Sequence, residues 1–125
     1  MKTLLLVGLG GGLGSMLRYL ATCFITGRIT RFPAICGTFA VNFTGCLIIG
    51  IAFGLSERYS WFSPQIRLFL TTGICGGYTT FSAFAYENIN LMRNGNYSLS
   101  LVYILASVVV CFSATFVGFA IGKSC

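Results

Sequence analysis

Long runs of uncharged, mostly apolar residues constrain this sequence more than any other feature. Residues 32–56, 68–86 and 94–122 contain no Lys, Arg, Asp or Glu, and residues 3–27 contain a single charged residue, Arg18. A helix of about 20 apolar residues is long enough to cross a hydrocarbon core of about 30 Å. The sequence therefore predicts an all-α membrane protein with four membrane-spanning helices.

The expected spans leave no residues for a separate soluble domain. We place them at residues 3–27, 33–56, 66–92 and 97–122 of one transmembrane domain, residues 1–125. Only 8% of the residues are charged, whereas a soluble domain has about 25%. Residues 1–7 also resemble the start of a secretory signal peptide, but no small-x-small cleavage site follows. We therefore expect this segment to remain as part of the first span.

The few ionisable residues exclude most catalytic sites. The chain has no His and no Asp, and its two carboxylates are Glu57 and Glu87. A Ser-His-Asp triad, a carboxylate pair or a His/Cys/carboxylate metal site therefore cannot form, and we expect no enzyme activity. The eight Lys and Arg residues are isolated, so we expect no nucleic-acid partner. The six cysteines lack C-x-x-C spacing, and we interpret them as small apolar side chains.

Glycine residues recur four positions apart in three of the spans. The pairs are Gly8 and Gly12, Gly10 and Gly14, Gly50 and Gly54, and Gly118 and Gly122. Small residues at this spacing let helix backbones approach closely in a membrane. We therefore expect these glycines to lie at contacts between helices. The glycine-rich segment at residues 8–15 also resembles a dinucleotide-binding fingerprint, G-x-G-x-x-G. However, Leu13 occupies the position of the third glycine of that fingerprint.

The third span contains a segment that forms a helix poorly. Gly76 and Gly77 are adjacent, and the β-branched Thr79 and Thr80 follow Tyr78. The sequence predicts a break in the helix at residues 76–80, with a continuous helix that has a packing notch as the alternative. Backbone groups freed at this depth must be satisfied by protein, water or an ion. Half-helix ends of this kind form the ion sites of several transport proteins.

Polar side chains within the spans form a second pattern. Tyr103, Ser107, Cys111 and Thr115 recur every four residues and so share one face of a helix. The other polar residues at this depth are Asn42, Thr79, Thr80 and Ser82. Single residues of this type commonly form hydrogen bonds between helices. A stripe along the whole span instead offers hydroxyl donors across the bilayer.

Two aromatic residues and one arginine add features suited to an anion. Phe81 and Phe84 are three residues apart and share a helix face. A phenyl ring has a positive edge, so such rings are able to line an anion path, although core packing is the alternative. Arg18 is costly in lipid and should face protein or water, where it would concentrate anions.

The positive charges divide almost evenly between the two membrane faces. Four spans place both chain ends on one face, together with Lys2, Arg58, Arg67 and Lys123, and place Arg28, Arg31 and Arg93 on the other. Loop charge directs insertion, so this near-tie predicts no strong preferred orientation. Either the tie arises by chance, or both orientations are made and pair as an antiparallel dimer.

Three motifs, each in its own span, resemble those of the Fluc (CrcB) family of bacterial fluoride ion channels. They are GGGLGSMLRY (Gly10–Tyr19), GTFAVN (Gly37–Asn42) and GGYTTFSAF (Gly76–Phe84). The resemblance covers essentially the whole chain. The sequence departs from the family pattern at Tyr78, Ala83 and Cys111, where the family more often has Leu, Thr and a hydroxyl residue.

This resemblance implies a fold, an assembly and a function. The fold is four transmembrane helices with the third broken near its middle, and the assembly is an antiparallel, dual-topology homodimer in the bacterial inner membrane. Backbone carbonyls of Gly76 and Thr79 from both subunits would hold a structural Na⁺ at the dimer interface. The implied function is passive export of cytoplasmic fluoride down its electrochemical gradient, which would reduce fluoride toxicity.

The resemblance also implies which residues fluoride meets. The ring edges of Phe81 and Phe84 would face the ion, and the Asn42 amide would donate to it. The remaining residues of the implied pathway are Thr80, Ser82, Tyr103, Ser107 and, near the vestibule, Arg18.

Two other functions compete with a fluoride channel. A small four-helix proton-coupled exporter of the multidrug type needs a carboxylate in its first helix, and this chain has none there. A non-transporting assembly subunit would account for the glycines but not for the polar and aromatic residues. The role of Glu87, near the end of the third span, stays open.

Overall fold

The computed structural model describes the whole chain, residues 1–125, as helices joined by short loops. In chain order the helices are α1 (Lys2–Thr26), α2 (Pro33–Arg58), α3 (Pro64–Leu68), the π-helix η1 (Phe69–Cys75), α4 (Gly76–Tyr78), α5 (Phe81–Arg93) and α6 (Tyr97–Ser124). The structure contains no strand, so the prediction of an all-α protein is confirmed. Helices α1, α2 and α6 are each long and apolar enough to cross a membrane.

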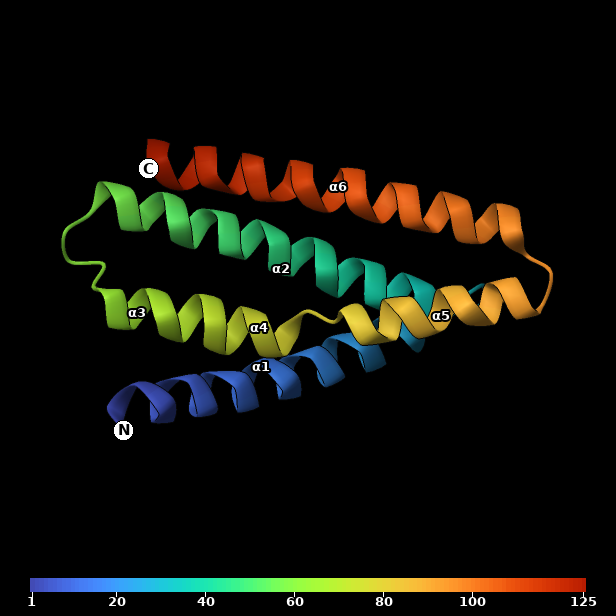
Figure 1. Cartoon of the computed structure of the whole chain (residues 1–125), viewed down its shortest axis with the longest axis horizontal. Helices are drawn as coiled ribbons and strands as arrows, with labels where there is room; N and C mark the ends of the chain where they lie inside the picture. The colour runs from blue at the N-terminus through green and yellow to red at the C-terminus, as the bar shows by residue number, and fades with distance from the viewer.

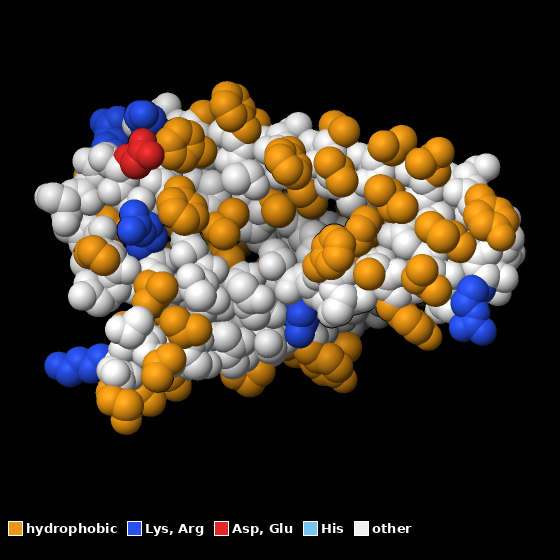
Figure 2. All heavy atoms as spheres, viewed as in Figure 1, with side chains coloured by type: hydrophobic (Ala, Val, Ile, Leu, Met, Phe, Trp, Pro, Cys, Tyr) orange, Lys and Arg blue, Asp and Glu red, His pale blue; other side chains and the backbone are white.

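The helices lie alongside one another, and both chain ends are at the same end of the molecule (Figure 1). Helices α3, η1, α4 and α5 follow one another along the length of the molecule, beside α1 and α2. Figure 2 shows hydrophobic side chains spread over the face in view. Large apolar residues such as Leu20, Leu105, Phe112 and Phe116 are exposed. An outer surface of this kind suits lipid or another apolar partner rather than water.

Glycines bring α2 and α6 into close contact. The two helices run in the same direction (Figure 1), and Gly50 and Gly54 on α2 face Gly118 and Gly122 on α6. A Cβ atom added to Gly50 would overlap the Thr115 carbonyl oxygen of α6, and one added to Gly118 would overlap the Leu47 carbonyl oxygen of α2. The predicted role of these four glycines in helix contact is confirmed, because only glycine allows these backbones to approach so closely.

The glycine run of α1 packs against η1 and α4. A Cβ atom at Gly10 would lie 2.9 Å from the Gly73 Cα atom, and one at Gly14 would lie 2.9 Å from the Tyr78 amide nitrogen. Gly8 and Gly12, by contrast, have no other atom within 4 Å of such a Cβ. The predicted contact role is therefore correct for Gly10 and Gly14 and wrong within this chain for Gly8 and Gly12, which lie on the outer face of α1.

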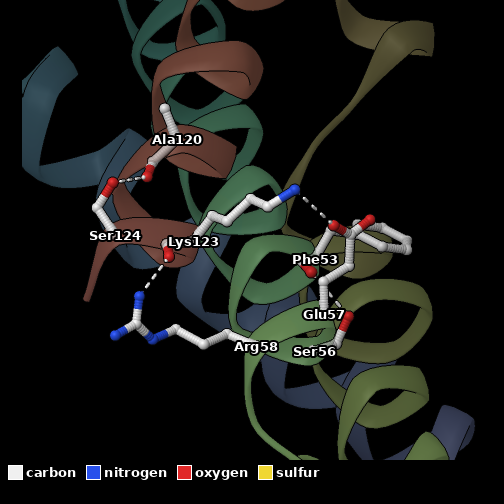
Figure 3. A network of polar contacts seen from close by, with 7 residues as sticks. All are labelled: Phe53, Ser56, Glu57, Arg58, Ala120, Lys123 and Ser124. Atoms are coloured by element: carbon white, nitrogen blue, oxygen red, sulfur yellow. Dashed lines mark hydrogen bonds and ion pairs between the residues drawn. The ribbon is translucent and has the colours of Figure 1, made fainter.

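Polar contacts join the C-terminal ends of α2 and α6 (Figure 3). Arg58 Nη1 donates to the Lys123 carbonyl oxygen at 2.8 Å, and Lys123 Nζ lies 3.4 Å from a Glu57 carboxylate oxygen. The Tyr59 hydroxyl donates to the Cys125 carbonyl oxygen at 2.6 Å. The ion pair is solvent-exposed, so it contributes at most about 1 kcal/mol. The main effect of these contacts is to hold the chain terminus against α2.

The backbone between α4 and α5 is extended for two residues. Helix α4 ends at Tyr78, Thr79 has ψ 159° and Thr80 has φ −149°, and α5 begins at Phe81. Thr80 is the N-cap of α5, and its hydroxyl accepts a hydrogen bond from the Ala83 amide at 3.3 Å. Such a cap satisfies one of the free amides at the start of a helix. This extended segment determines how the candidate site is arranged.

Candidate functional site

The side chain of Asn42, on α2, satisfies the extended backbone at Thr80. Asn42 Oδ1 accepts from the Thr80 amide at 2.8 Å, and Asn42 Nδ2 donates to the Thr80 carbonyl oxygen at 3.0 Å. A buried backbone group left without such a partner costs about 1–3 kcal/mol. The family resemblance implies that the Asn42 amide donates to fluoride. In this structure one of its two N–H groups is already bonded to Thr80, which leaves the other free to do so.

Two side chains of α1 reach the opposite side of the same segment. Arg18 Nη1 donates to the Thr79 carbonyl oxygen at 3.2 Å, and Ser15 Oγ donates to the Gly77 carbonyl oxygen at 3.4 Å. Arg18 therefore faces protein, as its position inside the first expected span requires.

The carbonyls of Gly76 and Thr79 differ in their partners. In a continuous α-helix the Thr80 amide would donate to the Gly76 carbonyl, but here it donates to Asn42 Oδ1. The Gly76 carbonyl thus loses its helical donor, and Gly76 itself is exposed. The Thr79 carbonyl accepts from Arg18. Carbonyl oxygens are hard ligands of the kind that suit an alkali or alkaline-earth cation.

A cavity of about 350 Å³ opens beside the extended segment, between α2, the η1–α5 region and α6. The predicted site residues that line it are Asn42, Gly76, Thr79, Thr80, Phe81, Phe84 and Ser107. Three predicted residues do not line it. Ser82 is exposed, with its hydroxyl 3.3 Å from that of Thr80, Arg18 lies on the α1 side, and Tyr103 lies behind Phe84.

The Ser107 hydroxyl, on α6, lines this cavity without a hydrogen-bond partner. Its oxygen atom is buried. A buried hydroxyl without a partner costs free energy, and most such groups in proteins are satisfied. The Ser107 hydroxyl is therefore available to a ligand that enters the cavity.

Three aromatic rings stand in a row, and the first two of them, Phe81 and Phe84, line the cavity. The Phe81 and Phe84 ring centroids are 5.6 Å apart, and the Phe84 ring meets the Tyr103 ring edge-on at 5.0 Å. Phe81 is 78% exposed in the single chain, whereas Tyr103 is buried. The row therefore leads from an open surface into the interior of the molecule.

Sequence comparison identifies the chain at this point. The family model described as CrcB-like protein, Camphor Resistance (CrcB), matches residues 5–119. The chain belongs to the CrcB-like family. A relative from Flavobacterium psychrophilum, named fluoride-specific ion channel FluC, is 48% identical over 124 residues and covers 98% of each chain. Relatives with the same name from Gloeothece citriformis and Phocaeicola vulgatus are 47% and 50% identical, over 98% and 88% of this chain.

This CrcB-like chain also has a polar contact that the sequence analysis missed. The Thr38 hydroxyl donates to Glu87 Oε1 at 2.6 Å, and the Tyr103 hydroxyl donates to Glu87 Oε2 at 2.8 Å. The carboxylate of α5 thus joins α2 to α6 at the inner end of the aromatic row. Helical spacing contained the signal, because Thr38 lies four residues before Asn42 and Glu87 three residues after Phe84, on shared faces.

Proposed function

We propose that this chain is a fluoride-specific channel through which cytoplasmic fluoride leaves the cell passively, down its electrochemical gradient. The observation that carries this proposal is the cavity in which Asn42, the Phe81 and Phe84 rings and the free Ser107 hydroxyl meet. Relatives that cover 98% of the chain are named fluoride-specific ion channels, and an ion channel is not an enzyme. Export of this kind would reduce fluoride toxicity.

The chemistry of the cavity suits a small, strongly hydrated anion. Its wall offers the remaining N–H of Asn42, the hydroxyl of Ser107 and the positive ring edges of Phe81 and Phe84, which together would replace water. The free amides at the start of α5 add partial positive charge. None of these groups is a full positive charge, so none would bind the ion too tightly to release it. Beyond Phe84, Tyr103 would continue the path once its hydroxyl turns away from the Glu87 carboxylate.

We propose that two oppositely oriented copies form the channel. Phe81 is 78% exposed although it lies beside the cavity, so a single chain leaves one side of the path open. Basic residues are nearly equal in number at the two ends of the chain's expected spans, which favours insertion in both directions. A C-terminal reporter read separately on each side of the membrane is expected to give signal on both sides. Signal on one side alone would contradict the antiparallel pair.

We propose that Gly76 and Thr79 hold a structural Na⁺ between the two copies. The donor set fits, because the Gly76 carbonyl lacks its helical donor and carbonyl oxygens suit a hard cation. When bound, the ion would supply positive potential beside the anion path and satisfy carbonyls at membrane depth. Arg18 donates a hydrogen bond to the Thr79 carbonyl oxygen from the α1 side. This oxygen would therefore keep a hydrogen-bond donor whether or not the cation is bound.

We propose that α3, η1, α4 and α5 cross the lipid together as one interrupted span. The chain would then be a single domain of four spans in the bacterial inner membrane, with both ends on one side. The extended residues Thr79 and Thr80 would lie at membrane depth, where the bonds from Asn42 and Arg18 satisfy their backbone.

Efflux from proteoliposomes tests the proposed function. Liposomes that contain the purified protein and a potassium fluoride load are expected to release fluoride to a fluoride electrode when a potassium ionophore removes the opposing voltage. Liposomes loaded with chloride are expected to stay at the leak of protein-free liposomes. Equal release of both halides, or fluoride release that depends on a proton gradient, would overturn the proposal and favour an unselective pore or an exporter.

A further inference from the structure

Two thiols line the wall of the cavity from different helices. Cys46 of α2 and Cys111 of α6 are free cysteines, and they lie one helical turn before Gly50 and Thr115, where the backbones of these two parallel helices meet. Both line the cavity of about 350 Å³, and both also line a second hollow of about 640 Å³ further along the groove between α2 and α6. The pair therefore stands at the boundary between the two spaces, at the edge of the cavity that holds the candidate anion site.

The surroundings of the pair restrict what it can bind. Cys75 also lines the first cavity but is buried, and no three His, Cys, Asp or Glu side chains in the chain are placed to hold one metal ion. The second hollow is lined mainly by apolar residues such as Phe53, Phe116 and Phe119. The pair thus offers two soft sulfur ligands and no carboxylate or imidazole.

The net charge of the metal complex favours divalent soft metals over monovalent ones. Thiolates prefer soft cations, and each thiol that binds a metal releases its proton. A divalent cation held by two thiolates gives a neutral complex, which an apolar cavity tolerates far better than a net charge. The step is balanced, because two S–H bonds break, two S–metal bonds form and two protons leave to solvent.

We propose that Cys46 and Cys111 form a two-coordinate binding site for soft divalent metal cations, such as Hg²⁺, at the wall of the cavity. Occupancy of the site joins α2 to α6 and places a large ion beside Ser107 and Phe112, which line the same cavity. The bound metal therefore blocks the anion path. The binding claim stands on the thiol pair alone, whereas the block rests on the proposed channel function.

Titration of the purified full-length protein with Hg²⁺ tests the binding claim. The background is the C23S/C36S/C125S variant, which keeps the three cysteines of the cavity. We expect one Hg²⁺ per chain, seen as sulfur-to-metal charge-transfer absorption, with two sulfur ligands by X-ray absorption. Changing a residue that only orients a metal ligand costs about 10–100-fold in affinity, so C46S and C111S, which remove a ligand, should each cost roughly 100-fold or more.

C75S is the matched control, since it removes a cavity thiol outside the pair, and it should bind Hg²⁺ like the background. Loss of binding in C75S, or normal binding in C46S and C111S, would overturn the proposal. A second measurement uses the wild-type chain, so it tests the proposal even where the variants fold poorly. Hg²⁺ should protect Cys46 and Cys111 together from maleimide labelling in mass spectra, and labelling of both at the unprotected rate would also overturn it.

Fluoride efflux separates the two claims. Hg²⁺ is expected to stop efflux in the background variant and to spare it in the same variant with C111S added. If the protein binds Hg²⁺ at two sulfurs but never conducts fluoride, the proposed function fails and the site stands. If Hg²⁺ stops efflux equally with and without Cys111, the blocking role of this pair is wrong.

Discussion

Replacing Phe84 by isoleucine is expected to cut fluoride efflux from liposomes by at least about tenfold, which corresponds to about 1.4 kcal/mol in the barrier. Phe84 is the middle ring of the aromatic row, 5.6 Å from Phe81 and 5.0 Å from Tyr103. Isoleucine keeps a large apolar side chain but has no positive ring edge to face an anion. The loss should therefore appear in conduction rather than in folding. A fluoride electrode measures the efflux, and size-exclusion chromatography checks that the assembly persists.

Phe81→Ile is expected to lower efflux in the same way. Its ring stands at the open end of the row and is 78% exposed in the single chain, so it loses little packing within its own subunit. Phe24→Ile provides a matched control, because Phe24 lies on α1, packs under the Arg28 guanidinium and does not line the cavity. Wild-type efflux in both Phe81→Ile and Phe84→Ile would refute the aromatic role.

Features that depend on composition and spacing could be predicted from the sequence. Uncharged stretches that are long enough to cross a bilayer as helices predicted an all-helical chain. Small residues four positions apart predicted the contact between α2 and α6 at Gly50 and Gly118. Both follow from rules that act within one helix or one pair of helices. The family was also predicted correctly, because its motifs are local and keep their order along the chain.

Features that depend on which side chains meet could not be predicted. No local pattern revealed that η1 is a π-helix or that the Asn42 amide bonds both backbone groups of Thr80. The bonds from Thr38 and Tyr103 to Glu87 join residues 49 and 16 positions apart. Such pairings follow from the packing of whole helices, so the sequence marks the candidates by their shared helix faces but not their partners.

A pair of glycine substitutions at one contact should have opposite effects. Gly77→Ala is expected to destabilise the protein by at least about 1–3 kcal/mol, the usual cost of overpacking. The added Cβ atom would overlap the Gly11 carbonyl oxygen and lie 3.0 Å from the Gly11 Cα atom. Backbone atoms cannot move aside as a flexible side chain can, so α1 would be pushed away from α4. Thermal unfolding in detergent, read by fluorescence, measures the loss.

Gly11→Ala is the matched control, because it adds the same methyl group on the other side of this contact. A Cβ atom at Gly11 has no other atom within 4 Å, and alanine favours a helix over glycine by about 1 kcal/mol. This variant should therefore unfold at the same temperature as the wild type or slightly above it. If both variants lose stability equally, a neighbour outside the chain covers the outer face of α1. If neither does, the close approach of Gly77 to α1 is not what holds these helices together.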